Sequence, residues 1–346
     1  MITYQDAGVN IKEGTVAVEK IKNHVASTKT KSVLTNVGGF GSGFSLKEIN
    51  AMYQSPVLVQ SMDGVGTKTI VARMANDYRF LGHDLLSACA NDIVVMGATP
   101  LTILDYIASA HLNADVIERI IGSLAQACRE QSVALVGGEM AQMPDTYLRG
   151  EWDFVGIVTG VVEESKMITG DTVCEDDCVI GFASNGLHTN GFSLARKLLF
   201  EVGGFSIHDV HPTLEKKISE VLLAPHINYT KPILDLLKNK IDIHGMAHIT
   251  GGGIWDNIPR VLPKEYSVEI KRNSWKIPPI FKLLVELGQL DEQSAYHTFN
   301  MGLGFIAMMD EQNWKAAQII LKNYPDLTAC QVGKVVKGGH CVRLIK

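Results

Sequence analysis

The chain has 346 residues, of which 46% are hydrophobic and 20% are charged, and its 32 basic and 37 acidic residues give a formal net charge of −5. This composition is typical of a globular protein of about two domains, and it lacks the basic block that would follow a nucleic-acid backbone. No apolar run approaches the ~18 residues that a membrane helix needs, which excludes a membrane-spanning protein. Six cysteines in so long a chain do not form a disulfide framework, and the opening MITYQDAGVN lacks the basic start and apolar stretch of a signal peptide. We therefore expect a cytoplasmic enzyme with reduced thiols.

The first half of the chain alternates apolar, strand-like runs with helical patterns. The first ~35 residues are polar, and we expect them to be mobile. Residues 81–97 favour a long buried helix closed by Gly97. Strands are expected at residues 56–61, 101–108, 133–136 and 154–162, and helices at residues 68–76 and 114–131.

The second half begins after charged residues that gather near residues 163–166 and 175–177. We place a domain boundary near residue 170, which divides the chain into residues 1–169 and 170–346. Strands are expected at residues 178–183, 266–270, 302–309 and 331–336, and helices at residues 191–200, 215–223, 226–238 and 279–288. Both halves mix strands and helices, so the predicted fold class is α+β or α/β.

Acidic residues lie at the ends of two predicted strands and on the buried helix between them. Asp63 follows PVLVQS, Glu139 follows VALVGG, and Asp84 and Asp92 lie on the helix at residues 81–97. So apolar a helix should not carry carboxylates inward unless a cation meets them. One alternative is that the two helix acids are caps or salt-bridge partners. The other, which we favour, is that the four acids converge on Mg²⁺, a hard cation held by a few carboxylates and substrate phosphates.

Three glycine-rich turns accompany these acids, and each is either a flexible loop or a phosphate-binding loop. They are GGFGSG at residues 38–43, DGVGTK at residues 63–68 and TGGG at residues 250–253. The second adds a lysine and a hydroxyl at a helix start, which is a natural anion site. Together with the acids, the turns predict a site for a polyphosphate and a metal.

Histidines mark two further turns. His188 lies in SNGLHTNG at residues 184–191, where Thr189 or Asn190 is the expected helix cap. His188 is either part of this capped helix entry or a substrate contact. His248 is expected to be a packed histidine at the end of a strand.

Two weaker patterns do not support a site by themselves. Cys174 and Cys178 are four residues apart within CEDDC, but a zinc site of this type needs a second close pair, which the other cysteines do not supply. We therefore favour an ordinary surface loop there. Gly302 and Gly304 match a dinucleotide fingerprint in letters only, because they lie inside an apolar strand-like run.

Over nearly its whole length the chain resembles the phosphoribosylformylglycinamidine cyclo-ligase family, the aminoimidazole ribonucleotide synthetases of purine synthesis. The motifs that carry the resemblance are YQDAGVNI at residues 4–11, GGFG at 38–41, DGVGTK at 63–68, CANDIVVMGATP at 89–100, LDY at 104–106, GGEMAQMP at 137–144, SNGLHTNGFSL at 184–194, HITGGGIWDNIPRVLP at 248–263 and FNMGLG at 299–304. DGVGTK, ND and GGE recur in a wider superfamily that includes selenophosphate synthetase, thiamine-monophosphate kinase and formylglycinamide ribonucleotide amidotransferase. The run at residues 248–263 together with TFNMG is much more specific to the cyclo-ligase.

The resemblance implies an enzyme that uses ATP and Mg²⁺ to phosphorylate the formyl oxygen of formylglycinamidine ribonucleotide. The amidine nitrogen then closes the imidazole ring, and ADP and phosphate are released. The resemblance also implies a homodimer whose first halves build a shared barrel of strands.

The same resemblance assigns roles to individual residues. The metal is assigned to Asp63, Asp92 and Glu139, with Asp84 as a possible supporting acid, and the catalytic residues are Lys68, Asp63 and His188. Nucleotide phosphates are assigned to Gly38, Gly39, Gly41, Gly64, Gly66, Thr67 and Lys68, with Lys22 as a weaker nucleotide contact. Substrate contacts are assigned to His188, Asn190, Gly252 and Asn300.

The chain departs from the family pattern at a few positions. Gln142 stands where the family has an acid, so we do not assign it to the metal, and Thr189 stands in place of a serine. Selenophosphate synthetase needs a cysteine near the first glycine loop, but residues 1–88 contain none. Thiamine-monophosphate kinase does not explain the matched second half. A nucleotide-binding scaffold without catalysis would have lost a metal acid or Lys68, and all are retained.

Overall fold

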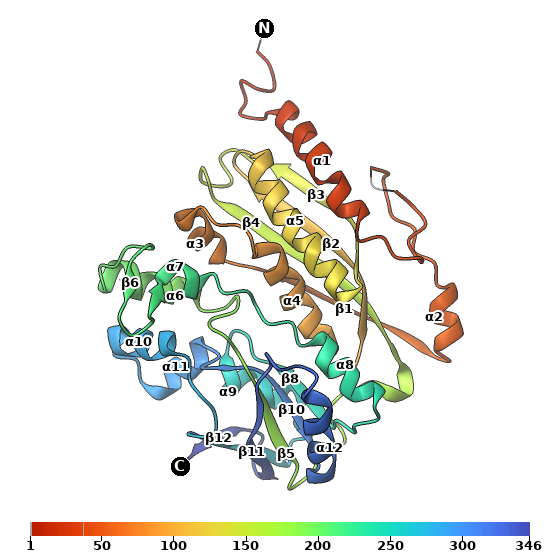
Figure 1. The fold of residues 1–346 in the computed structure, drawn as a ribbon, viewed down its shortest axis with the longest axis vertical. Coiled ribbons are helices and arrows are strands. Elements are labelled where there is room, and N and C mark those ends of the chain that lie inside the picture. The colour runs from red at the N-terminus through yellow and green to blue at the C-terminus, as the bar shows by residue number, and fades with distance from the viewer. Residues whose placement is uncertain (1, 37) are drawn as a thin grey trace. The chain divides into compact units, whose positions relative to one another are not determined.

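Helices and sheets build both halves of the chain in the computed structural model, which describes residues 2–36 and 38–346 (Figure 1). One unit runs up to Ile93 and includes Pro100–Ser165, and the other comprises Val94–Thr99 and Lys166–Lys346. The expected fold class of two mixed units is therefore confirmed, while a barrel at a dimer interface stays a prediction. Within the described residues, no helix is both long and apolar enough to cross a membrane.

The first unit is built on a four-stranded sheet with the strand order β1-β4-β2-β3. Its strands are β1 (Pro56–Gly64), β2 (Thr99–Ser109), β3 (Ala134–Gln142) and β4 (Trp152–Glu163). β1 is antiparallel to β4, and β2 is parallel to β3. All four strands were predicted, but each extends beyond the apolar run of residues from which it was predicted. The expectation that Asp63 and Glu139 follow their strands is therefore wrong, because β1 and β3 continue through them.

Helices cover one face of this sheet. They include α3 (Lys68–Ala75), α4 (Leu81–Val94) and α5 (Ala114–Gln131), and a short helix α2 (Lys47–Met52) precedes β1. The side chain of Asn113 caps α5 by accepting hydrogen bonds from two backbone N–H groups of its first turn. α4 packs directly on α5, because an added Cβ on Gly82 would overlap the backbone of Ile120 and Leu124. α4 ends three residues before the Gly97 predicted to close it.

The polar N-terminal region contains a helix that the sequence did not predict, α1 (Ile11–Ala26), and its expected mobility stays a prediction. The Asn10 side chain caps this helix by accepting from the backbone N–H of Glu13. Gln142 of β3 holds the cap in place, because its amide donates to the Asn10 carbonyl and accepts from the Asn10 N–H, both at 2.8 Å. The buried Ala17 and Val25 anchor the helix further. The helix was not predicted because most of its residues are polar and only a narrow apolar stripe packs inward.

The other face of the first sheet carries exposed apolar side chains. Leu58 and Met62 of β1 are 58% and 68% exposed, and Ile157 of β4 and Leu104 of β2 are 39% and 42% exposed. Met62 lies opposite Ile157 in the register of β1 and β4, so the two share this face. Contiguous exposed apolar surface of this kind marks a contact surface in soluble proteins.

The second unit contains a six-stranded sheet with the order β12-β9-β11-β5-β10-β8. The strands are β5 (Cys178–Ala183), β8 (Gly245–His248), β9 (Tyr266–Lys271), β10 (Leu303–Met309), β11 (Ala329–Lys337) and β12 (Val342–Ile345). Every residue of β10 is buried, as expected for a central strand covered on both faces. A two-stranded ribbon of β6 (Val210–His211) and β7 (Lys216–Lys217) lies outside this sheet.

The helices of the second unit are shorter than predicted in places. They are α6 (Phe192–Arg196), a π-helical turn (Lys197–Val202), α7 (Ile218–Leu222), α8 (Thr230–Lys238), α9 (Gly253–Asn257), α10 (Pro279–Gly288), α11 (Glu292–Thr298) and α12 (Glu311–Leu321), with a 3-10 turn at Ile258–Val261. Another 3-10 turn, Glu164–Lys166, lies at the boundary between the two units. The predicted helix at residues 215–223 is in part the strand β7. The helix predicted at 226–238 begins only at Thr230.

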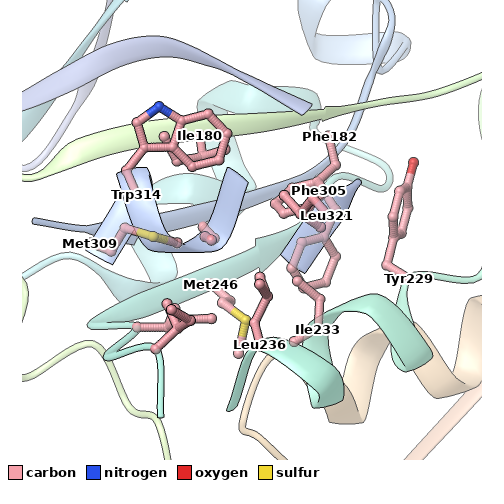
Figure 2. Packing of buried hydrophobic residues seen from close by; sticks show 14 of the residues in the cluster. Ile180, Phe182, Tyr229, Ile233, Leu236, Met246, Phe305, Met309, Trp314 and Leu321 are labelled. Atoms are coloured by element: carbon pink, nitrogen blue, oxygen red, sulfur yellow. The ribbon is translucent and has the colours of Figure 1, made fainter. Parts of the chain in front are cut away.

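The core of the second unit lies between the sheet and the helices α8 and α12 (Figure 2). Phe305 of β10 meets Phe182 of β5 edge-on with ring centroids 5.9 Å apart, and the Tyr229 ring lies 5.3 Å away. Ile233 and Leu236 of α8 complete the contact from below the sheet. These aromatic pairs fix the end of β5, from which the next loop departs.

Candidate functional site

Two half-buried carboxylates lie on the helix-covered face of the first sheet. Asp63, near the end of β1, accepts a hydrogen bond from the backbone N–H of Gly64 at 2.7 Å. Asp92 of α4 accepts from the hydroxyl of Ser61, also on β1, at 2.9 Å. Residues 61 and 63 of a strand point to the same face, so β1 presents both groups toward α4. This placement keeps the two acids on rigid elements.

The thiol of Cys89 on α4 contacts the backbone of the sheet beside these acids. Its sulfur contacts the carbonyl oxygens of Gly156, at 3.5 Å, and Asp63, at 3.9 Å. Burial raises the pKa of this thiol, and the charges of Asp63 and Asp92 raise it further. Cys89 is therefore a protonated packing residue beside the two carboxylates.

Lys68 and Asp84 form a buried ion pair. The Lys68 ammonium lies 2.7 Å from Asp84 Oδ2, and both side chains are 0% exposed. Burial lowers the pKa of Lys68, and the charge of Asp84 opposes this effect. Lys68 is the first residue of α3, as predicted. Its side chain is buried, so it is not a solvated lysine on the surface. The structure therefore shows the salt-bridge alternative for Asp84.

A cavity of about 550 Å³ opens between α1, the first glycine loop and the strands β2 and β3. Its lining includes the predicted phosphate-loop residues Gly38, Gly39 and Gly41 and the predicted metal ligand Glu139. A second pocket of about 250 Å³ is lined by Lys22 and shares Val25, Asn36, Ser42, Leu135 and Val136 with the first. The sequence-predicted nucleotide residues of the first loop and of α1 are thus brought together.

Asp105 is a residue of this cavity that sequence reasoning missed. It lies on β2 opposite Gly138 of β3, and an added Cβ on Gly138 would overlap the Asp105 carboxyl. Burial raises the pKa of Asp105 to about 7. A carboxyl group that titrates near neutral pH in a cavity is a candidate functional group. The only signal in the sequence was an acid inside the apolar run LTILDYIA.

The four predicted metal acids do not form one compact cluster. Among residues 2–36 and 38–346, the one group of three or more His, Cys, Asp or Glu with ligand atoms within 4.8 Å of one another is Cys174, Asp177 and His244. Glu139 is exposed on β3, whereas Asp84 is committed to Lys68. The assignment of Asp63, Asp92 and Glu139 to a metal therefore stays a prediction.

The second unit holds the predicted histidine turn. His188 is 2% exposed and has a φ of 60°, a left-handed conformation that is uncommon for a residue with a side chain. Its ring stacks on His226 with centroids 4.0 Å apart, and Nε2 of His226 lies 3.2 Å from Nε2 of His248. The predicted cap is wrong, because Gly191 is the N-cap of α6 and no side chain caps the helix.

The histidine turn connects to the third glycine loop. Asn190 accepts a hydrogen bond from the backbone N–H of Gly251 at 3.2 Å. The amide of Asn257 donates to the carbonyls of Gly251 and Gly253 at 3.2 and 2.8 Å, which fixes the loop. Gly252 has a φ of 89°, so its conformation favours glycine. Asn190 and Gly252 therefore lie on one connected pair of turns.

Asn300 is buried, and its side chain forms hydrogen bonds with the histidine turn. Its side chain accepts from the Ser184 hydroxyl at 2.8 Å and from the Gly302 N–H at 2.9 Å, and it donates to the Gly186 carbonyl at 2.9 Å. Gly304 nearby has no room for a side chain, because an added Cβ would lie 2.6 Å from His188 Cε1. The histidine turn is thus held in one conformation by its neighbours.

Comparisons with known proteins match both units. The N-terminal domain of AIR synthase related protein matches residues 49–162, and its C-terminal domain matches residues 175–346. Phosphoribosylformylglycinamidine cyclo-ligase of Bacillus cytotoxicus is 44% identical over 335 residues, which cover 97% of this chain and 95% of that protein.

Two solved structures share the fold. Thiamine-monophosphate kinase from Stenotrophomonas maltophilia superposes with a TM-score of 0.68 at 14% identity and covers 95% of both chains. The hydrogenase maturation protein HypE in complex with ATP superposes with a TM-score of 0.62 at 15% identity, covering 97% of this chain and 89% of that chain. At these identities the likeness shows the fold alone.

Proposed function

This chain belongs to the phosphoribosylformylglycinamidine cyclo-ligase family, and we propose that it closes the imidazole ring of aminoimidazole ribonucleotide through an O-phosphorylated amide. It is a purine-biosynthesis enzyme of an ATP-using family. The observation that carries the proposal is the 44% identity over 97% of the chain, together with the retention of Lys68, Asp63, Asp92 and Glu139.

The proposed reaction has two steps. In the first, the formyl oxygen of formylglycinamidine ribonucleotide attacks the γ-phosphorus of ATP, and ADP leaves. In the second, the amidine nitrogen attacks the activated formyl carbon, the C–O bond breaks, and phosphate departs with the former formyl oxygen. Loss of a proton then completes the aromatic ring. Because the reactants supply the bond-making groups, the protein acts mainly by positioning them and neutralising charge.

The donor set of the first unit fits Mg²⁺. Asp63 and Asp92 offer hard carboxylate oxygens, Ser61 orients one of them, and the neighbouring thiol of Cys89 is kept protonated. Mg²⁺ is commonly bound by one or two carboxylates together with substrate phosphates, and it would neutralise charge on the transferring phosphoryl group. We propose that Glu139, which lines the nucleotide cavity, would hold the metal together with Asp63 and Asp92, and that Asp84 supports Lys68.

We place the nucleotide in the cavity of the first unit. Gly38, Gly39 and Gly41 line it, and Lys22 lines the adjoining pocket. Glycine turns let backbone groups approach phosphates closely. The turn of Gly64, Gly66 and Thr67 would add further N–H donors at the start of α3.

We place the ribonucleotide substrate against the turns of the second unit. Asn190 and Gly252 lie on joined turns that offer backbone and amide groups to a polar ligand. His188, held by its stacked partner, is the proposed group beside the reacting amidine, and Asn300 keeps its turn in position. These roles rest on the family assignment and on this connected geometry.

We also propose that the enzyme is a homodimer whose first units form a shared barrel. The exposed apolar face of Leu58, Met62, Leu104 and Ile157 supports this, because a second copy would cover it. Closing two open sheets against each other also removes unpaired strand edges.

The proposal is tested by supplying formylglycinamidine ribonucleotide, ATP and Mg²⁺ and measuring aminoimidazole ribonucleotide. Wild-type protein should form it with one ADP per product. Asp92→Asn should abolish turnover while the protein stays folded, because a metal carboxylate is lost. Asp115→Asn, at a carboxylate that is 71% exposed, is the matched control and should turn over normally. ATP binding without product would instead indicate a nucleotide-binding scaffold, and normal activity of Asp92→Asn at limiting Mg²⁺ would refute the metal assignment.

A further inference from the structure

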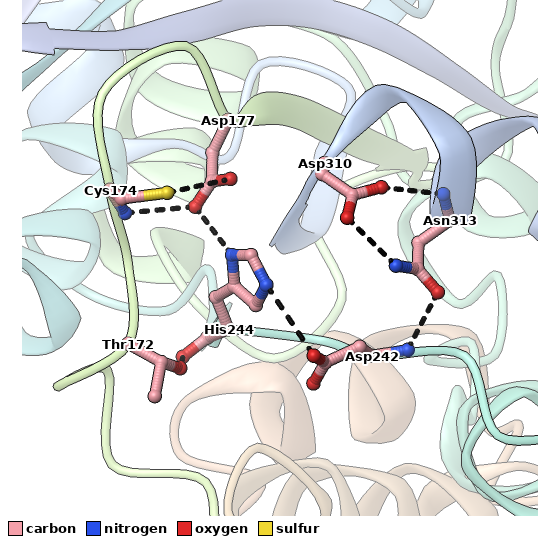
Figure 3. A network of polar contacts seen from close by, with 7 residues as sticks. All are labelled: Thr172, Cys174, Asp177, Asp242, His244, Asp310 and Asn313. Atoms are coloured by element: carbon pink, nitrogen blue, oxygen red, sulfur yellow. Dashed lines mark hydrogen bonds and ion pairs between the residues drawn. The ribbon is translucent and has the colours of Figure 1, made fainter.

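Three side chains of different chemistry meet in the second unit, away from the residues assigned to the reaction (Figure 3). The Cys174 sulfur lies 3.4 Å from Asp177 Oδ1, and His244 Nδ1 lies 2.7 Å from Asp177 Oδ2. Their potential ligand atoms all lie within 4.8 Å of one another. A thiol, an imidazole and a carboxylate thus surround one small volume.

Backbone hydrogen bonds hold the segments that carry these three side chains in place. Asp177 precedes β5 and its side chain is 1% exposed, and its Oδ2 also accepts from the backbone N–H of Cys174 at 3.0 Å. His244 immediately precedes β8, and its backbone N–H donates to the carbonyl of Met308 on β10 at 2.8 Å. The site therefore joins the turn before β5 to the start of β8, two segments far apart in sequence.

We propose that Cys174, Asp177 and His244 bind a divalent transition metal of the zinc type, with Asp242 orienting the histidine. A thiolate and an imidazole select borderline metals such as Zn²⁺ over Mg²⁺, which prefers oxygen ligands alone. In tetrahedral zinc sites the ligand atoms lie about 2.0–2.3 Å from the metal and therefore roughly 3–4 Å from one another. The Cys174–Asp177 separation of 3.4 Å lies in this range, and the 2.7 Å between His244 and Asp177 is shorter because these two groups are hydrogen-bonded to each other.

The protons and charges of such a site balance. The Cys174 thiol and the Nδ1–H of His244 both point at Asp177, so the metal takes the place of these two protons. The thiol proton leaves to solvent, and the neutral imidazole exchanges its one proton from Nδ1 to Nε2 through solvent, so metal binding releases one net proton. A cation of charge +2 then meets one thiolate and one carboxylate, which leaves the site neutral.

Asp242 lies behind the His244 ring, the position where metal-bound histidines have a hydrogen-bond partner, and its side chain is 77% exposed. Its carboxylate lies 3.8 Å from Nε2 of His244, on the side of the ring away from Asp177. A carboxylate behind a metal-binding imidazole fixes its tautomer and raises its basicity. Asn313 of α12 accepts from the backbone N–H of Asp242 at 2.9 Å and so holds this residue in place.

The structure also explains why the cysteine spacing alone did not predict this site. Cys178 is buried on β5 within the core of the second unit, so it does not pair with Cys174. The partners of Cys174 are instead a neighbouring acid and a histidine about 70 residues later in the chain. Burial and the nearby Asp177 raise the pKa of the Cys174 thiol, which makes it a poor nucleophile without a cation.

The test uses the full-length protein stripped of metal with a chelator and titrated with Co²⁺ and then Zn²⁺. Wild-type protein should bind one equivalent of Co²⁺ at this site with a thiolate-to-cobalt charge-transfer absorption, and Zn²⁺ should displace it. Cys174→Ser should lose the absorption and at least ~100-fold of the zinc affinity, since even loss of an outer partner costs ~10–100-fold. Asp242→Asn should lose about 10-fold.

Matched controls keep the outcome specific. Cys341→Ser and His340→Gln change the same residue types outside the cluster and should leave the absorption and affinity unchanged. The melting temperature of wild-type protein should rise with Zn²⁺, and that of Cys174→Ser should not. Absence of a thiolate–cobalt band in wild-type protein, or an unchanged band in Cys174→Ser, would overturn the proposal.

Discussion

Replacing Lys68 by methionine separates the structural and catalytic roles of the buried ion pair. Lys68→Met keeps most of the stem but removes the charge that lies 2.7 Å from Asp84, and both side chains are fully buried. Removing one partner of such a pair leaves an uncompensated charge and costs about 3–5 kcal/mol. For a unit of this size, that corresponds to a fall of roughly 6–20 °C in the melting temperature.

A double variant should recover the stability but not the activity. Lys68→Met with Asp84→Leu replaces the pair with apolar groups, which is often neutral or stabilising. If Lys68 also stabilises the transferring phosphoryl group, turnover of both variants should fall by at least ~100-fold, a barrier increase of about 2.7 kcal/mol. Nucleotide affinity should fall much less, because the glycine turns still hold the phosphates.

Urea unfolding and steady-state kinetics on the same preparations measure these effects. Lys47→Met, on the exposed side of α2, is the control and should change neither stability nor kcat. A single Lys68→Met variant as stable as wild type would refute the buried-pair reasoning. A double variant with wild-type turnover would show that Lys68 acts only in folding.

Three further predictions concern Asp105, Gly304 and the exposed sheet face. Burial raises the pKa of Asp105 from its ordinary 3.8 to about 7, so the folded state keeps a proton that the unfolded state loses. Relative to Asp105→Asn, wild-type stability should therefore fall by up to ~1.4 kcal/mol per pH unit between about pH 4 and pH 7, as measured by urea unfolding of both proteins across pH. Gly304→Ala should lower the free energy of unfolding by about 1–3 kcal/mol, because the added methyl would overlap the ring of His188; an unchanged urea midpoint would contradict this. Leu104→Lys should dissociate the dimer in sedimentation at micromolar concentration, whereas Leu148→Lys, at an exposed loop position, should not; a wild-type monomer would argue against the interface.

The sequence predicted the fold well where one physical signal dominated. The helix at residues 114–131 and the strand at residues 178–183 match the structure to the residue, because amphipathic spacing and a buried apolar run identify them without tertiary information. α1 was missed because its order depends on the clamp between Asn10 and Gln142, a contact across more than 130 residues. The full lengths of β1 and β3 were not predicted because their last residues include glycines and acids, which do not favour strands. These residues are in strands because they pair with neighbouring strands in the sheet.

The sequence predicted most of the residues of the candidate site, but not which of them contact one another. The motif DGVGTK indicated a lysine near an anion, yet only the structure shows that Lys68 is buried against Asp84. Asp105 carried no motif of its own, since its raised pKa arises from burial in the sheet. Likewise, His244 reaches Cys174 and Asp177 only because β5 and β8 both pair with β10.

The most direct test of the proposed chemistry follows the formyl oxygen itself. The protein is supplied with ATP, Mg²⁺ and formylglycinamidine ribonucleotide that carries a heavy-oxygen label on the formyl group. If ring closure proceeds through the phosphorylated amide, mass spectrometry should find one labelled phosphate for each aminoimidazole ribonucleotide formed. Product formed with unlabelled phosphate, or ATP hydrolysis without ring closure, would contradict the account.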